Sequence, residues 1–253
     1  MPWYEVVALL AAGMAAGTMN TIVGSGTLIT FPTLLFFGYT PLVANVSNTV
    51  GLVTGGLTGI AGYRAELVGQ GPTLRRLVPV SFIGALTGAI LLLELPESAF
   101  EAIVPALIGA ALLMVLFGPR LQTWAVARHP DHDSLGRRLL MTVGVFAAGI
   151  YGGYFGAAQG ALLVGLMSVL MTISLQRINA AKNVLVTVVN SVAAITFMLV
   201  AWERINWPVA ALIAAGALPG GYVGARVGRR LSPVMLRGVI VVVGVVAIAK
   251  MVA

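Results

Sequence analysis

Two glycine-rich stretches, residues 17–27 (GTMNTIVGSGT) and residues 149–160 (GIYGGYFGAAQG), decide the fold of this chain. Each lies in the middle of a long, uncharged, apolar block. These blocks are too long for one ordinary membrane helix, and their glycines weaken the helix where the middle of the bilayer should fall. Unwound backbone is tolerated at that depth only if it is buried in protein or lines a watery cavity. We therefore expect the two breaks to form the walls of a transport site.

The composition is that of an integral membrane protein. Of the 253 residues, 59% are hydrophobic and 9% are charged, and the mean hydropathy is +0.99, whereas about a quarter of the residues in a soluble domain are charged. The apolar runs are long and continuous, unlike the short alternating strands of an outer-membrane barrel. We expect an all-α protein with about eight hydrophobic helical blocks that crosses the cell membrane, the inner membrane of a bacterium or archaeon, several times.

The net charge of +7 and the polar clusters have simple explanations. The Lys and Arg residues lie in short connecting segments, as in cytoplasmic loops, and this pattern does not indicate nucleic-acid binding.

The sequence contains no cysteine, so no thiolate site or disulfide is expected. The segment 129–133 (HPDHD) offers metal-ligand side chains, but its proline and mixed charge favour a solvated loop. We predict no metal and no cofactor. The start, MPWYE, lacks a basic region, so we expect no cleaved signal peptide.

The order of the blocks repeats along the chain. We predict a first membrane repeat over residues 1–117, a hydrophilic basic linker over 118–138 and a second membrane repeat over 139–253. Each repeat has four blocks and starts with a broken or re-entrant helix, a plan common among secondary transporters. The matches are separated by nearly constant offsets: Gly17 and Gly24 match Gly149 and Gly156 at 132 residues, Asn48 matches Asn183 at 135, and Gly84 and Gly88 match Gly220 and Gly224 at 136.

The positions of the arginines indicate how the repeats are oriented. In the first repeat they lie after the second block, at Arg64, Arg75 and Arg76, and the next connector is acidic; in the second repeat they follow the third block, from Arg226 to Arg237. If arginine marks the cytoplasmic side, the repeats are inverted, which fits re-entrant hairpins followed by three full spans. Parallel repeats with four spans each are the alternative.

The candidate site residues come from the breaks and from the polar positions of the following helices. Helix N-termini at a break attract anions, and glycine permits close approach of the backbone. For any single glycine, packing between helices is the alternative explanation; for Asn or Ser it is an interhelical hydrogen bond, and for Tyr151 it is interfacial anchoring. The predicted substrate-binding residues are Asn20, Gly24, Ser25, Gly26, Asn48, Tyr151, Gly156, Gln159, Gly160, Lys182, Asn183 and Asn190.

Lys182 is the most specific single indication of function. An ionisable residue inside a membrane helix costs about 2.5 kcal/mol or more and should face a cavity or a partner. No acidic residue lies in the broken blocks or in the helices that follow them, apart from Glu5 near the N-terminus. An anion from solution therefore remains as the expected partner. The alternative is that Lys182 extends to the membrane surface, as Arg177 nearby suggests.

These residues resemble the sulfite exporter TauE/SafE family over nearly the whole chain. The resemblance is carried by the first break with Pro32, by residues 44–48 (ANVSN), by residues 151–156 (YGGYFG), by residues 181–183 (AKN) and by Asn190 with Ser191. It implies a permease for small sulfur-containing anions such as sulfite, sulfonates, sulfoacetate or thiosulfate. The sequence departs from the family pattern where residues 24–26 read GSG instead of three glycines, and where residues 157–160 read AAQG, so the pocket and its cargo stay open.

We therefore predict a secondary transporter for a small sulfur oxyanion that works by alternating access, and not an enzyme. An anion channel is the main alternative. An intramembrane enzyme fits less well, because Ser25 has no histidine near it in the sequence and both histidines lie in the linker. The expected partners are a small anionic substrate and membrane lipid. The sequence leaves open a coupling ion, H⁺ or Na⁺, and assembly into a homo-oligomer.

Overall fold

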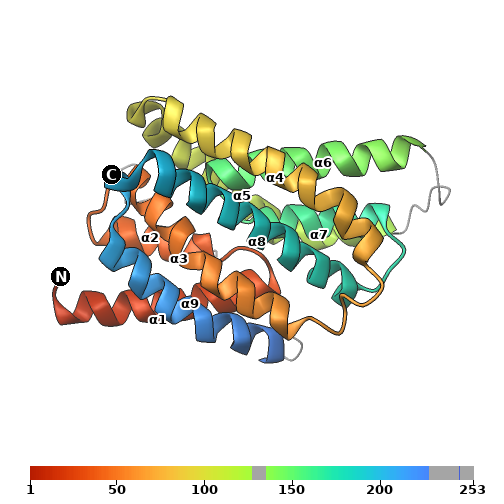
Figure 1. The fold of residues 1–253 in the computed structure, drawn as a ribbon, viewed down its shortest axis with the longest axis horizontal. Coiled ribbons are helices and arrows are strands. Elements are labelled where there is room, and N and C mark those ends of the chain that lie inside the picture. Colours follow the sequence, from red (N-terminus) through yellow and green to blue (C-terminus); the bar gives the residue numbers. More distant parts are fainter. Residues whose placement is uncertain (127–134, 228–244, 246–253) are drawn as a thin grey trace.

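A computed structural model describes residues 1–126, 135–227 and 245, and these residues form an all-helical bundle (Figure 1). This confirms the predicted all-α class. Helices α1, α4, α8 and α9 are long and apolar enough to cross a membrane. The segment 129–133 and the arginines at 229, 230 and 237 lie outside the described residues. The helices are α1 (Trp3–Ile22), α2 (Thr27–Phe36), α3 (Pro41–Gly62), α4 (Gly71–Glu94), α5 (Glu97–Val126), α6 (Leu135–Tyr154), α7 (Gln159–Leu170), α8 (Leu175–Val200), the short 3₁₀ helix η1 (Trp202–Arg204) and α9 (Trp207–Val227).

The first broken block is a hairpin. Helix α1 ends at Ile22, and the chain turns at Gly24, whose φ of +80° is a left-handed conformation that favours glycine. The chain then turns back, so that Gly26 lies against the backbone of Ala16. Tyr39, just beyond α2, donates a hydrogen bond of 2.7 Å from its hydroxyl to Oε1 of Glu5, in the first turn of α1. Helix α2 therefore returns toward the end of the bundle from which α1 started.

The second broken block has the same form. Helix α6 ends at Tyr154, and the chain turns at Gly156, with a φ of +77°. Further back, Gly144 of α6 lies against the side chain of Leu166 in α7. Arg137, at the start of α6, donates from Nη2 to the carbonyl oxygen of Val169 at 3.5 Å. Helix α7 thus runs antiparallel to α6, and Figure 1 shows the two hairpins opening toward opposite ends of the bundle.

Each hairpin packs against a helix from the other half of the chain. Helix α9 lies parallel to α1 and α3, and the contacts are so close that a Cβ on Gly17 or Gly55 would meet the backbone of Ala217. Helix α4 lies parallel to α6 in the same way, with Gly84 against Phe146 and Gly88 against Ile150. Small residues allow such close helix contacts in membranes.

Helices α3 and α8, which occupy matching places in the two halves, run in opposite directions. Gly56 in α3 meets Thr187 in α8, and Tyr63 just after α3 packs with Ala180 near the start of α8. The end of α9 joins the same end of the bundle, since Gly62 contacts Ala225. The connector after α3, the start of α8 and the end of α9 therefore lie together.

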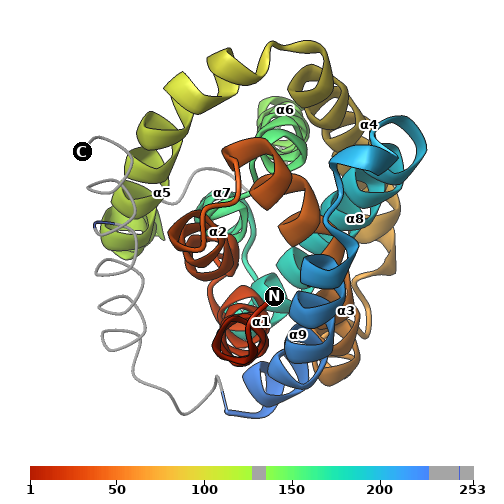
Figure 2. The same cartoon turned by 90° about the vertical axis from the view of Figure 1, so that its left-hand side faces the viewer.

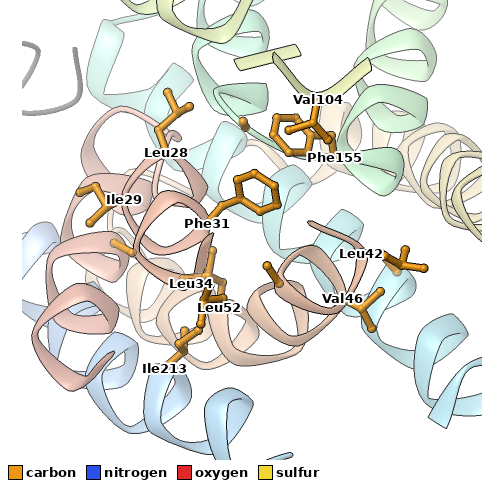
Figure 3. Close-up of a cluster of buried hydrophobic side chains, with 14 of the residues drawn as sticks. Leu28, Ile29, Phe31, Leu34, Leu42, Val46, Leu52, Val104, Phe155 and Ile213 are labelled. Atoms are coloured by element: carbon orange, nitrogen blue, oxygen red, sulfur yellow. The ribbon is translucent and has the colours of Figure 1, made fainter. Parts of the chain in front are cut away.

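The short helices α2 and α7 lie in the interior, surrounded by longer helices (Figure 2). The largest apolar cluster joins α2 to the second break: the ring of Phe31 points toward Phe155 and Val104 (Figure 3). The Phe31 and Phe155 rings meet edge to face at 5.2 Å between centroids, and Phe100 of α5 lies 6.2 Å from Phe155. This aromatic contact helps to hold the second break against the first hairpin.

The boundaries around the predicted linker differ from the sequence analysis. Helix α5 continues to Val126 and α6 already starts at Leu135. Residues 118–126 and 135–138, which we assigned to the linker from their polarity, are helical. Polar and charged residues are compatible with a helix that extends beyond its apolar portion.

Candidate functional site

The two breaks meet in the structure. The backbone N–H of Gly160 donates a hydrogen bond of 3.1 Å to the carbonyl oxygen of Gly24. A Cβ on either residue would overlap the backbone of the other, so only glycine fits at this contact. Two segments that are more than one repeat apart in sequence thus form one junction.

Several backbone N–H groups at this junction have no acceptor among the described residues. They precede or begin the two short helices: Ser25, Gly26 and Thr27 at α2, and Ala157 and Ala158 at α7. Unpaired N–H groups at a helix start, together with the helix dipole, favour an anion. The junction therefore presents donors from two helix N-termini.

Lys182 lies at the same junction and is fully buried, with 0% of its surface exposed. A Cβ on Gly160 would lie 2.9 Å from Cδ of Lys182. The ammonium donates to the carbonyl oxygens of Asn20 at 2.9 Å and Thr21 at 3.1 Å, in the last turn of α1. Asn179, on the preceding turn of α8, donates from Nδ2 to the Thr21 oxygen at 3.2 Å.

This geometry excludes one alternative for Lys182 and corrects one expectation. The side chain does not extend to the surface, which was the alternative. An anion is also not its only available partner, because that argument considered side chains and left out the backbone. The last carbonyl groups of a helix carry partial negative charge and lack intrahelical donors, so the end of α1 holds the ammonium in place.

Asn48 is engaged in packing. The hydroxyl of Thr30 donates to its Oδ1, and its Nδ2 donates to Oγ1 of Thr27 at 3.3 Å. These bonds join α3 to α2, which is the interhelical alternative named for asparagine. The threonines at positions 27 and 30 were missed by the sequence analysis, although their spacing places them on one face of a helix.

Ser25, Gln159 and Asn183 are different. Each is at least nine-tenths buried. The Ser25 hydroxyl, both amide atoms of Gln159 and Nδ2 of Asn183 find no hydrogen-bond partner in the part of the chain that the structure describes. Buried polar groups are normally paired, so each such group needs an explanation. These three side chains are the ones best suited to contact a ligand.

The remaining candidates have clear places. Tyr151 donates from its hydroxyl to the carbonyl oxygen of Ala157 at 2.6 Å and so supports the second turn. Asn20 lies with its Cβ against Gly26, and Gly156 forms the turn itself. Asn190 is buried about two turns beyond Lys182 on α8, and no contact brings it to the breaks. Asn45, absent from the candidate list, donates from Nδ2 to the carbonyl oxygen of Tyr154 at 3.0 Å.

Comparison with known proteins shows similarity to membrane transporters. The chain is 26% identical over 247 residues to a "Probable membrane transporter protein" of Haemophilus influenzae, covering 96% of this chain and 93% of that protein. It is 25% identical over 250 residues to "Probable membrane transporter protein YfcA" of Escherichia coli K12, covering 96% and 88%. A "Probable membrane transporter protein ORF9" of Sinorhizobium sp is 25% identical over 249 residues, covering 97% and 91%.

No solved structure matches the chain. The model of the family described as "Sulfite exporter TauE/SafE" matches residues 9–251, which is nearly the whole chain. The resemblance found in the break motifs is thereby confirmed, and this multi-pass membrane protein belongs to the TauE/SafE family.

Proposed function

We propose that this membrane transporter moves a small sulfur oxyanion, such as sulfite, a sulfonate or sulfoacetate, by alternating access around the junction of the two breaks. One observation carries the proposal: the N-termini of α2 and α7 meet beside a fully buried lysine. Helix N-termini attract anions, and broken helices meeting in the membrane are the common form of a transporter site.

The chemistry of the donors fits an oxyanion. An oxyanion only accepts hydrogen bonds, and the junction offers unpaired donors: backbone N–H groups at both helix starts, the Ser25 hydroxyl and Nε2 of Gln159. Asn183, next to Lys182 on α8, has a further unpaired donor in its Nδ2. The ammonium of Lys182 adds a positive charge within the same junction. The family description names sulfite export, and this supports a sulfur oxyanion as the cargo.

The packing supports an inverted pair of repeats. The matching helices α3 and α8 are antiparallel. The hairpin of each half packs against a helix of the other half, α1 against α9 and α6 against α4. Gly84 lies against Phe146, while its match Gly220 lies against Met14, which precedes Phe146 by the same 132 residues that separate the breaks. Two similar, oppositely oriented units around one site are a common basis of alternating access in transporters.

The charge at the helix ends agrees with this arrangement. Figure 1 places the N-terminus, the α4–α5 connector and η1 at one end of the bundle. That end carries Glu94, Glu97 and Glu203. The opposite end carries most of the described arginines, including those at positions 64, 75, 76, 137, 177 and 226. By the bias of cytoplasmic loops, the arginine-rich end faces the cytoplasm.

The test is flux of radiolabelled sulfite into liposomes that contain the purified protein, together with thermal unfolding in sulfite, sulfate, thiosulfate, sulfoacetate and taurine. A bound ligand raises Tm, so we expect one of the sulfur oxyanions to stabilise the protein and to be transported. Lys182→Gln should reduce flux by at least about tenfold, since a charge-assisted interaction is lost.

Asn179→Ala is the matched control for Lys182→Gln. It removes another donor from the Thr21 carbonyl but leaves the positive charge, so flux should fall much less. Normal anion binding and flux in Lys182→Gln would contradict the proposed role. Flux that grows linearly with sulfite concentration, without saturation, would indicate the channel alternative.

A further inference from the structure

The ends of α1 and α6 are built alike. At the end of α1 the carbonyl oxygen of Met19 accepts from the N–H groups of Val23 at 2.8 Å and Gly24 at 3.1 Å. At the end of α6 the carbonyl oxygen of Tyr151, 132 residues later, accepts from Phe155 at 2.9 Å and Gly156 at 3.0 Å. The next two carbonyl groups therefore occupy equivalent places in the two helices.

These equivalent carbonyl groups differ in their hydrogen-bond donors. In α1 they belong to Asn20 and Thr21, and both accept from the ammonium of Lys182. In α6 they belong to Gly152 and Gly153, and within the described ranges no group donates to either oxygen. The residue that matches Lys182, Ser47, is too short to replace it, and its Oγ accepts from the N–H of Asn206 at 2.9 Å.

Two further oxygens without donors lie at the end of α6. The amide of Asn45 is held there by its bond to the Tyr154 carbonyl, and its Oδ1 has no donor. The amide of Gln159 lies against Cα of Gly152, and its Oε1 also has no donor. Both side chains are almost completely buried, with 0% and 1% of their surface exposed. Buried acceptors without donors need a hydrogen-bond donor or a cation.

We infer that the end of α6 binds a sodium ion, held by the carbonyl groups of Gly152 and Gly153 and by the side-chain oxygens of Asn45 and Gln159. Helix C-terminal ends and unwound carbonyls bind Na⁺ in transporters with broken helices. The ligands are neutral oxygens, and α3, α6 and α7 contain no Asp or Glu. Mg²⁺ and Ca²⁺ are usually bound with carboxylates, and none of these ligands titrates as a proton carrier. A monovalent metal ion is the remaining choice.

The proposed sodium ion would occupy at the end of α6 the place that the Lys182 ammonium occupies at the end of α1, but the ion can dissociate. It also connects the two sites, because Oε1 of Gln159 would contact the cation while Nε2 of the same amide remains free for the anion. The binding of sodium does not depend on the identity of the transported anion. Its role in driving transport rests on the function proposed above.

The experiment measures thermal unfolding of the purified full-length protein without any sulfur compound, in sodium gluconate, potassium gluconate or N-methylglucamine gluconate at equal ionic strength. We expect sodium to raise Tm saturably by about 3 °C or more, and the other two cations to raise it much less. An equal rise in all three salts, or none in sodium, would overturn the inference. A sodium response without any response to sulfur oxyanions would leave the cation site standing and refute the proposed cargo.

Three variants locate the site. Gln159→Leu removes one oxygen at similar volume and should increase the sodium concentration needed for half of the Tm rise by at least about tenfold. Asn48→Ala is the control: it removes a buried amide of α3 that is already bonded to two threonines, so it should lower Tm but keep the sodium response. Ser47→Lys supplies an ammonium at the place that matches Lys182, and a folded protein should no longer respond to sodium. A normal sodium response in Gln159→Leu would overturn the assignment even if Ser47→Lys does not fold.

Discussion

The first and second breaks have the same backbone conformation, but their side chains differ in hydrogen bonding. Both helices before the breaks are followed by a glycine of positive φ, and at both ends the same pair of N–H groups donates to one carbonyl oxygen. After the first break the amide of Asn48 is saturated by Thr27 and Thr30. After the second break, Nδ2 of the matching Asn183 and both amide atoms of Gln159, which stands in the place of Thr27, have no partner in the described part of the chain. The two matching asparagines therefore differ: Asn48 is used in packing, and Asn183 keeps an unpaired donor.

Substitution of the turn glycines should give the largest difference in stability between the two breaks. Gly24→Ala combines a left-handed conformation, which costs about 1–2 kcal/mol in an L-residue, with overlap on the backbone of Gly160, so we expect a loss of more than about 3 kcal/mol. Gly156→Ala should cost only about 1–2 kcal/mol, since its Cβ would meet a single oxygen at 3.0 Å. Thermal unfolding in detergent measures both.

Gly38→Ala is the control for this pair. Its φ is +87°, and no atom lies within 4 Å of an added Cβ, so it reports the conformational cost alone. Equal losses for Gly24→Ala and Gly38→Ala would mean that the contact between the two breaks is not tight.

Substitution of the matching asparagines, Asn48 and Asn183, should give a difference in stability of intermediate size. Asn48→Ala leaves the hydroxyls of Thr27 and Thr30 without their partner and should cost about 1–3 kcal/mol of stability. Asn183→Ala should change stability by less than about 1 kcal/mol, because its Nδ2 makes no bond that is lost, but it should weaken the stabilisation by the transported anion. Unchanged ligand-induced shifts in Asn183→Ala would remove this residue from the site.

The smallest effect should come from the donors that cap the two helix ends. Asn45→Ala and Asn179→Ala each remove one hydrogen bond to a terminal carbonyl group, which is worth about 1 kcal/mol. Asn179→Ala should be the milder change, because Lys182 still donates to the same Thr21 oxygen. For Asn45→Ala no second donor is available to Tyr154 in the described part of the structure. A larger loss in Asn179→Ala would contradict this order.

Much of the fold was predictable from the sequence because membrane helices leave strong signals. The length of the apolar blocks and the glycines at 24 and 156 located both breaks. The partner of Lys182 was not predictable, because the carbonyl groups at a helix end carry no signal in residue type. The different roles of Asn48 and Asn183 also depend on threonines from another helix, which only the folded structure brings near. The continuation of α5 to Val126 was not predictable for a similar reason, since polarity alone does not end a helix.

The exchange of neighbours between the two halves has a consequence for how such a chain can be assembled. Helices α1 and α3 bury their glycine faces against α9, and α6 buries its glycine face against α4. A protein with only one half would expose these narrow grooves to lipid and could fill them only by associating with a second copy placed the other way up. If the two halves are copies of one module, as the repeat predicts, that module alone would have worked as a pair of identical subunits inserted in the membrane in both directions.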